Sequence, residues 1–240
     1  MANSHDTIAV MRVFAISDLH LSSLDNKPMD VFKGWDNHID RIQQSWLQMV
    51  GEDDIVLIGG DLSWAMTLPN AIPDLEFVAS LPGHKVLIKG NHDYWWKSIT
   101  TLRAALKPKV YALQNDSLRI GNFVICGTRG WTVPEKHQTE QDKKIYNREI
   151  ERLKLSLQNM QTLKQDGDTV ISMAHYPPFN SLLKSTPFTD LYNQYGVSKV
   201  IYGHLHGKNI RVPKVLQINI TQFYLTSCDL VDHQLVSITD

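Results

Sequence analysis

The stretch VLIKGNHD, residues 86–93, decides the fold because it joins a short apolar run to a group of polar side chains. The apolar run predicts a buried strand, and the glycine ends it where the backbone must turn. The polar group follows directly and consists of Asn91, His92 and Asp93. In open α/β sheets, ligands bind at the carboxyl ends of strands, where these side chains fall. The alternative is a polar turn that only caps a helix, so the other strand ends decide between the two.

Four further apolar runs end in the same kinds of residue. The runs are residues 10–17, 55–58, 169–174 and 199–202, and the residues that follow them are Asp18 and His20, Asp61, His175, and His204 and His206. Side chains two positions apart project to the same side of an extended backbone, so each Asp/His or His/His pair can converge. Each motif alone is compatible with a polar loop after a core strand. Because parallel strands place their carboxyl ends at one sheet edge, we expect all of these side chains and Asn91 to meet there.

The spacing of apolar side chains predicts helices between the strands, over residues 35–50, 70–81, 99–106 and 144–164. Pro73 is expected in the first turn of the second of these helices. The strand–helix alternation favours parallel, right-handed βαβ units. After residue 108 the pattern changes to short strands at 110–113, 117–120 and 123–126, the last two joined by a Gly121-Asn122 hairpin turn. We therefore predict an α/β fold, a four-layer αββα sandwich of two mixed sheets flanked by helices.

Length and composition fit one domain over residues 11–240, with residues 1–10 as a flexible leader. The 24 basic and 25 acidic residues leave no global positive field, so no stable nucleic-acid partner is expected. Cys126 and Cys228 lack metal-site spacing and are interpreted as buried thiols of a reducing compartment. No signal peptide or bilayer-length apolar run is present in the sequence, which predicts a soluble, cytoplasmic protein without a membrane partner. The oligomeric state stays open.

Carboxylates packed together raise one another's pKa, and bound cations remove that cost. Imidazole and oxygen ligands without thiolate suit Mn, Fe, Zn or Ni. Seven ligands are too many for one tetrahedral ion and fit two divalent ions, bridged by a carboxylate and a hydroxide about 3.5–4 Å apart. The predicted metal ligands are Asp18, His20, Asp61, Asn91, His175, His204 and His206. The expected cofactors are therefore two divalent metal ions.

Such a centre activates the bridging hydroxide for attack on a phosphoester and polarises a phosphoryl oxygen. His92 is the natural proton donor or transition-state stabiliser. Asp93 either holds the His92 ring or caps the next helix. Asn91 and Arg129 are the candidates for binding substrate, Arg129 as a bidentate phosphate clamp, with a surface arginine beside a core Trp131 as the alternative. The polar segment 133–143 is expected to be mobile and is a candidate lid.

Taken together, five motifs resemble the ordered motifs of the calcineurin-like metallophosphoesterases, in a phosphohydrolase of bacterial type. In this sequence they are Asp18-Leu19-His20, Gly60-Asp61, Gly90-Asn91-His92-Asp93, His175 and Gly203-His204-Leu205-His206. The resemblance covers residues 18–206 and implies an αββα sandwich with a dinuclear metal centre that hydrolyses phosphoester bonds. It further implies that one metal takes Asp18, His20, Asp61 and His206. The other would take Asp61, Asn91, His175 and His204, with Asp61 as the bridge.

One departure narrows the expected activity. The protein Ser/Thr phosphatase branch follows its second motif with an Asp and an Arg, whereas here Asp61 is followed by LSWA, residues 62–65. Protein phosphatase activity is therefore not expected, and the substrate is predicted to be a small-molecule or nucleotide phosphoester. Monoester and diester both stay open, with Arg129 and Lys208 as the extra cations that would favour a monoester. The rival hypothesis is a catalytically silent scaffold of the same fold, whose usual mark, a lost ligand, is missing here.

Overall fold

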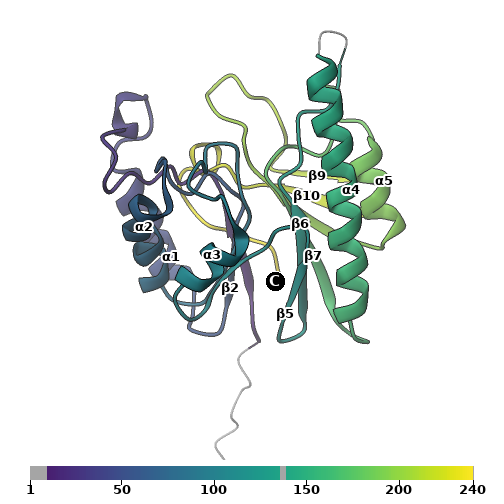
Figure 1. The fold of residues 1–240 in the computed structure, drawn as a ribbon, viewed down its shortest axis with the longest axis horizontal. Helices are drawn as coiled ribbons and strands as arrows, with labels where there is room; N and C mark the ends of the chain where they lie inside the picture. Colours follow the sequence, from purple (N-terminus) through teal and green to yellow (C-terminus); the bar gives the residue numbers. More distant parts are fainter. Residues whose placement is uncertain (1–9, 136–138, 240) are drawn as a thin grey trace, which may run out of the picture.

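The computed structural model describes residues 10–135 and 139–239 and shows two β-sheets packed face to face between two layers of helices (Figure 1). Helices α1, α2 and α3 cover one sheet, on the left of the figure, and α4 and α5 cover the other. The predicted αββα sandwich is confirmed. The predicted leader lies outside the described residues except for Val10.

The first sheet has the strand order β11-β1-β2-β3-β4. Strands β1 to β4 are parallel, and β11 pairs antiparallel with β1. Three helices join these strands along the chain, as predicted for βαβ units. The bounds are β1 Val13–Ile16, α1 His38–Met49, β2 Ile55–Ile58, α2 Leu68–Ser80, β3 His84–Leu87, α3 Ile99–Ala105, β4 Val110–Ala112 and β11 Val236–Ser237, with a 3₁₀ turn at Met29–Val31.

The second sheet has the order β5-β6-β7-β8-β10-β9, with a parallel centre and antiparallel edge strands. Ile120 pairs with Phe123, which confirms the two-residue hairpin turn. The bounds are β5 Ser117–Ile120, β6 Phe123–Thr128, α4 Glu140–Leu163, β7 Thr169–Ala174, α5 Pro187–Gln194, β8 Lys199–Tyr202, β9 Val215–Ile218 and β10 Thr221–Leu225, followed by a 3₁₀ turn at Cys228–Val231.

Both faces of the central strands are buried, which explains why their sequences are continuous apolar runs. In β1, Val13 and Ala15 join the core between the two sheets. The alternate residues Phe14 and Ile16 face the helices of the first sheet. A third core lies between the second sheet and its helices and includes Leu153 of α4. The sandwich therefore has three apolar layers, and the polar side chains that follow the strands gather at the sheet edges.

The starts of helices α2 and α4 are among the boundaries that differ from the sequence-based prediction. Helix α2 begins at Leu68, so Pro69 occupies the first turn and Pro73 lies inside the helix, where it removes one intrahelical N–H donor. Helix α4 begins at Glu140 because Thr139 caps it through reciprocal hydrogen bonds with Asp142. Residues 140–143 are therefore helical, residues 136–138 lie outside the described part, and the lid role of residues 133–143 stays a prediction.

The prediction of two buried thiols is confirmed, because Cys126 and Cys228 are both free and buried. Trp95 and Trp96 belong to the core of the first sheet and precede α3, whose N-cap is Ser98. None of the described helices has the length and apolar character that crossing a membrane requires.

Candidate metal centre

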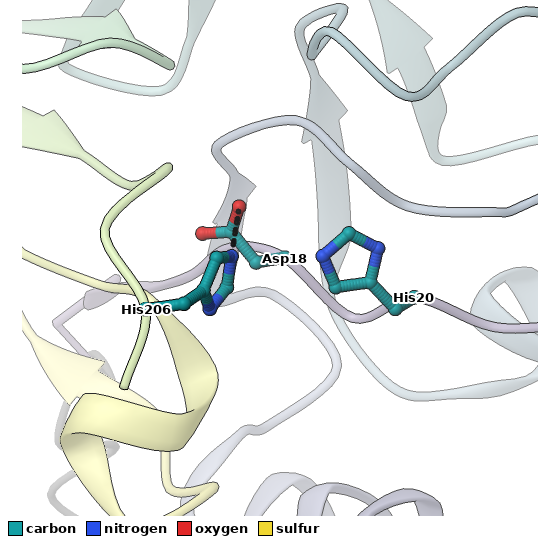
Figure 2. A group of neighbouring side chains, drawn as sticks. All are labelled: Asp18, His20 and His206. Atoms are coloured by element: carbon teal, nitrogen blue, oxygen red, sulfur yellow. Dashed lines mark ion pairs between the residues drawn. The ribbon is translucent and has the colours of Figure 1, made fainter. Parts of the chain in front are cut away.

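Polar side chains gather where five parallel strands end, at the edge shared by the two sheets. They lie on the loops that follow β1, β2, β3, β7 and β8. Two groups have potential ligand atoms within 4.8 Å of one another, namely Asp18, His20 and His206, and Asp18, Asp61 and His175. Figure 2 shows the first group, in which His206 approaches Asp18 from the opposite side of the site to His20. The sandwich therefore assembles the residues that the strand ends predict.

In the first group, the His206 ring lies between two carboxylates. Its Nε2 lies 3.2 Å from Asp18 Oδ1, and its Nδ1 lies 2.8 Å from Asp229 Oδ1. A carboxylate on one ring nitrogen fixes the ring so that the other nitrogen can face a metal ion. Asp229 was not predicted from the sequence. It lies in the 3₁₀ turn after β10, and no local motif marks it.

In the second group, His175 is fully buried and held by backbone. Its Nδ1 lies 2.9 Å from the carbonyl oxygen of Gly59, which can only accept, so Nδ1 carries the proton. The free Nε2 then faces Asn91 Oδ1 at 2.7 Å and Asp61 Oδ2 at 3.5 Å. Three electron-pair donors therefore converge on one point, an arrangement that a cation stabilises.

His204 lies beside this second group but outside the two clusters. Its ring centroid is 5.1 Å from that of His175 and 4.1 Å from that of Tyr176. Its backbone N–H donates to Asp18 Oδ2 at 3.0 Å. The structure thus brings the His204 backbone to the centre and leaves its ring at the side.

Asp18 is the residue common to the two groups. The physical reason is the position of β1 at the seam between the sheets. The N–H of Ser17 donates to the carbonyl of Thr226 after β10, which draws Asp18 toward the histidines of the second sheet. The bridging role that the resemblance implies for Asp61, a member of the second group, stays a prediction.

Burial and mutual repulsion control the charges of the carboxylates. Burial, together with the neighbouring Asp93 and Asp18, raises the pKa of Asp61 to about 9. Burial also opposes ionisation of Asp18, but the hydrogen bond and charge of His206 hold the pKa of Asp18 far below its usual range. Burial would lower the pKa of His206, yet Asp18 and Asp229 raise it to about 10. Without an ion, protons on Asp61 and His206 therefore balance the buried negative charge.

The remaining imidazoles are neutral, as metal ligands must be. Burial lowers the pKa of His20 to about 3 and that of His204 to about 4. Burial also lowers the pKa of His175. In addition, His20 Nδ1 is a buried atom without a hydrogen-bond partner among the described residues, and His206 Nε2 faces Asp18 Oδ1. This unpartnered nitrogen and the carboxylates beside it fit a divalent cation.

Four of the predicted ligands have a left-handed backbone, which is costly for residues other than glycine. The φ angles are 61° at Asp18, 49° at His20, 52° at Asp61 and 70° at His204. Such strain persists only where the surrounding structure enforces it, and it concentrates at functional sites. The strained backbone therefore indicates a functional site at the same edge of the sandwich as the cluster of polar side chains.

Asp93 has a different role from either that the sequence suggested. Its Oδ2 accepts from the N–H groups of Asp61 and Gly90, and its Oδ1 accepts from those of Leu62 and Ser63. The indole of Trp95 also donates to Oδ1. Both oxygens therefore accept hydrogen bonds from other groups, so Asp93 neither holds the His92 ring nor caps α3, whose N-cap is Ser98, and its catalytic role stays a prediction. The carboxylate ties the loop after β2 to the loop after β3.

His92 lies at the mouth of the site. The backbone N–H of His92 donates to Asp61 Oδ1 at 2.7 Å. The half-buried ring of His92 lies with its centroid 4.5 Å from that of the Trp64 ring. Burial, then the charges of His206 and Lys27, lower its pKa, although Asp18 opposes them. A pocket of about 640 Å³ opens here, with His20, His92 and His206 in its wall. His92 is therefore placed to reach a molecule that occupies this pocket.

Arg129 does not face this pocket. Its guanidinium lies over the Trp131 ring at 4.8 Å, and Nη2 is 3.6 Å from Glu149. It lines a separate pocket between β3, β6 and α4, because β6 ends away from the strands that bear His20 and His206. The structure places Arg129 outside the His92 pocket, and its role as a phosphate clamp stays a prediction. Lys208, the other predicted cation, does line that pocket.

The fold and the site define an α/β protein with clustered carboxylate and imidazole ligands at the carboxyl ends of its strands. The family model of the calcineurin-like phosphoesterases matches residues 11–208. The chain belongs to this family. A relative from Mycobacterium phage L5, the gene 66 protein, is 38% identical over 82 residues, which are 32% of this chain and 37% of the relative's length.

Two solved structures share the fold at low sequence identity. The protein TT1561 of Thermus thermophilus has a TM-score of 0.61 and 12% identity, over 95% of this chain and 98% of that one. The protein of unknown function AQ665 from Aquifex aeolicus has a TM-score of 0.50 and 16% identity, over 95% of both chains. These similarities extend over nearly the whole sandwich.

The charge balance predicts that metal binding strengthens as pH rises. Asp61 and His206 hold protons in the metal-free protein, and an ion must displace them to reach their ligand atoms. Affinity should increase by up to about tenfold per pH unit for each proton displaced. Competition titrations with a chelating indicator at about pH 6 and about pH 8 measure this, and equal affinities would contradict the assigned protonation.

Gly90 is expected to control the position of Asp61. A Cβ at Gly90 would collide with Asp61 Oδ1 and with the Asp61 backbone nitrogen. Gly90→Ala should therefore weaken metal binding by about 10- to 100-fold, as measured by metal content after dialysis. The control is Gly51→Ala, where the nearest atom to a new Cβ lies at an ordinary 3.5 Å. Unchanged metal content in Gly90→Ala would show that Asp61 does not bind the ion.

Asp93→Asn should destabilise the metal-free protein. An amide accepts at only one of the two positions, so at least two buried N–H groups lose their acceptor, at a cost on the order of 3 kcal/mol. Urea unfolding of the metal-free protein measures the difference. Asp53→Asn, at an exposed position in the turn before β2, is the control and should change the free energy of unfolding by less than about 0.5 kcal/mol. Equal stability of both variants would contradict the role of Asp93 as a tie between loops.

Proposed function

We propose that this chain is a metal-dependent phosphoesterase with a dinuclear centre at the carboxyl edge of the two sheets. The residues proposed to hold the two ions are Asp18, His20, Asp61, Asn91, His175, His204 and His206. The observation that carries the proposal is the pair of ligand groups that share Asp18. Membership of the calcineurin-like phosphoesterase family supports the same reaction class.

The donor set favours Mn, Fe, Zn or Ni, because it combines imidazole nitrogen with carboxylate and amide oxygen and contains no thiolate. When bound, such ions supply Lewis-acid polarisation of a phosphoryl oxygen and lower the pKa of water. The chain itself supplies orientation. Asp229 orients His206, the Gly59 carbonyl orients His175, and Asp93 holds the loops of Asp61 and Asn91 together.

His92 is the proposed proton donor or transition-state stabiliser. Its ring lines the pocket next to His20, with the two ring centroids 5.7 Å apart. The backbone N–H of His92 donates to Asp61 Oδ1, and this bond fixes the backbone that carries the ring. With its pKa lowered by burial, the ring is mainly neutral near neutral pH and presents one N–H donor. A donor at this position can stabilise the charge that develops on the phosphoryl and leaving oxygens.

Two pockets meet at the centre, and this favours a phosphodiester over a monoester. The His92 pocket contains Trp35, Trp64 and the cations Lys33, Arg41 and Lys208. On the other side of the centre, a mostly apolar pocket of about 510 Å³ is lined by His204 together with Tyr176, Phe179, Leu205 and Val212. A diester carries two substituents on phosphorus and can place one in each pocket, whereas a monoester carries one.

The scaffold alternative is not favoured. A silent member of the family would be expected to have lost ligands. Here all of the predicted ligands are present, with the left-handed backbone at four of them and the unpartnered Nδ1 of His20. Maintaining buried carboxylates and imidazoles without an ion has an energetic cost that a pure scaffold does not require.

His92→Ala should lower kcat by about 10²- to 10⁴-fold while two ions still bind, because its ring is proposed to act on the substrate and not on the metal. The assay uses metal-stripped protein with Mn²⁺, Fe²⁺, Ni²⁺ or Zn²⁺ and a pair of aryl phosphomonoester and phosphodiester substrates. Asp61→Asn should lose metal and activity together.

His84→Ala is the matched control, since His84 lies at the amino end of β3 beside Tyr111. Its activity should equal that of the unsubstituted protein. Full activity of His92→Ala would remove His92 from the mechanism, and absence of both ion binding and turnover in the unsubstituted protein would favour the scaffold.

A further inference from the structure

A second charged cavity, here called the basic pocket, lies beside the metal centre. Its volume is about 280 Å³. It opens between the loops after β3, β4 and β6 and the middle turns of α4. The charged side chains in its wall are Lys89, Lys97, Arg129, Arg148, Arg152 and Glu149. The proposed phosphoesterase mechanism does not use any of them.

The charge of this pocket is strongly unbalanced. Glu149 is the one carboxylate among the described residues of its wall. Glu149 is fully buried and already engaged, because it lies 2.6 Å from Arg152 Nη1 and accepts from Thr128 Oγ1 at 2.8 Å. The whole chain has a net charge of −1, so this concentration of cations is local. Five cations around one cavity repel one another unless an anion enters.

Two of these cations have no partner, and a third is incompletely satisfied. The Lys97 and Arg148 side chains are exposed and form no hydrogen bond or ion pair within the described part of the chain. Arg129 Nε is buried without a hydrogen-bond acceptor among the same residues. Guanidinium groups are suited to bidentate contacts with phosphate oxygens. The pocket therefore offers unused donors of the kind that bind oxyanions.

The basic pocket adjoins the metal centre through the backbone. The carbonyl of Arg129 accepts from the N–H groups of His175 and Tyr176, each at 3.0 Å. On the other wall, Lys89 lies two residues before Asn91 and donates from Nζ to the carbonyl of Trp96. The basic pocket therefore lies beside the loops that carry the predicted ligands Asn91 and His175.

The size of the pocket indicates what fits. Pockets for drug-sized ligands occupy about 300–1,000 Å³ and are mainly apolar. At about 280 Å³ and with a charged wall, this one suits a single small anionic group better than a nucleobase or an acyl chain.

We propose that the basic pocket binds a second phosphoryl group of the substrate, carried as a branch on one of the two substituents of the diester, so that the preferred ester carries an additional phosphate beyond the one that is hydrolysed. The proposal rests on the phosphoesterase function and narrows its substrate class. The ligand chemistry, a phosphoryl oxyanion, has two sources, the substrate itself and a free phosphate in solution.

The first measurement is binding of inorganic pyrophosphate to metal-stripped protein by calorimetry at low ionic strength, where exposed charges are least screened. The variant Lys97→Ala/Arg148→Ala removes two exposed cations that form no hydrogen bond or ion pair within the described part of the chain, so the fold should be retained. Pyrophosphate binding should weaken at least about tenfold, because the variant removes two charged donors to phosphoryl oxygens. The control, Lys154→Ala/Lys164→Ala, removes the same charge from α4 and its C-cap, outside the pocket, and should bind as the unsubstituted protein does.

The second measurement compares kcat/KM for two diesters with the same leaving group, one of which carries an additional terminal phosphate. The unsubstituted protein should prefer the phosphorylated ester, and Lys97→Ala/Arg148→Ala should lose this preference while hydrolysing the plain ester at the same rate. Together with weakened pyrophosphate binding, this result supports the proposal.

Weakened pyrophosphate binding with an unchanged substrate preference would mean that the pocket takes a free anion, and it would overturn the assignment to the substrate. Equal pyrophosphate binding in both double variants would overturn the pocket as an anion site. If no ester is hydrolysed by any form, the phosphoesterase function and the substrate assignment both fail, whereas the binding measurement still decides whether the pocket holds an anion.

Discussion

The candidate centre depends on one buried carboxylate that belongs to neither ligand group. Asp93 accepts four backbone N–H bonds and one indole N–H bond, and these bonds join the loop that carries Asp61 to the loop that carries Asn91. A carboxylate can do this because its two oxygens accept several bonds at once in a site without water. Without these bonds, nothing of this kind would fix the position of Asp61, after β2, relative to that of Asn91, after β3.

The remaining constraint is electrostatic, since acids and imidazoles lie together in a largely buried cluster. Asp61 and His206 keep protons that a divalent ion would displace, whereas His20 and His204 are neutral and ready to bind. Beside this centre, the basic pocket has an excess of positive charge, with five Lys and Arg side chains and one Glu in its wall. The edge of the sandwich thus places a site suited to cations next to one suited to anions, a combination that a phosphorylated substrate can satisfy.

Much of the fold could be predicted because its strands are local and continuous. The runs 55–58, 169–174 and 199–202 match β2, β7 and β8, since burial on both faces makes their sequences mainly apolar. Helix ends were less predictable. The start of α4 depends on the bond between Thr139 and Asp142, and that of α2 on a first-turn proline other than the one expected. Caps of this kind add only about 1 kcal/mol and leave a weak trace in hydrophobic periodicity.

The sequence alone determined which side chains end the parallel strands, because strand ends and their loops are contiguous in the chain. Only the tertiary structure decided how these side chains share charge. Asp229 reaches His206 from 23 residues away, and Asp18 became the common carboxylate because Ser17 bonds to Thr226 across the seam between the sheets. The basic pocket likewise joins β3, β6 and α4. Contacts between distant segments depend on how the two sheets pack against each other. Local residue patterns predict the strands and helices but not that packing.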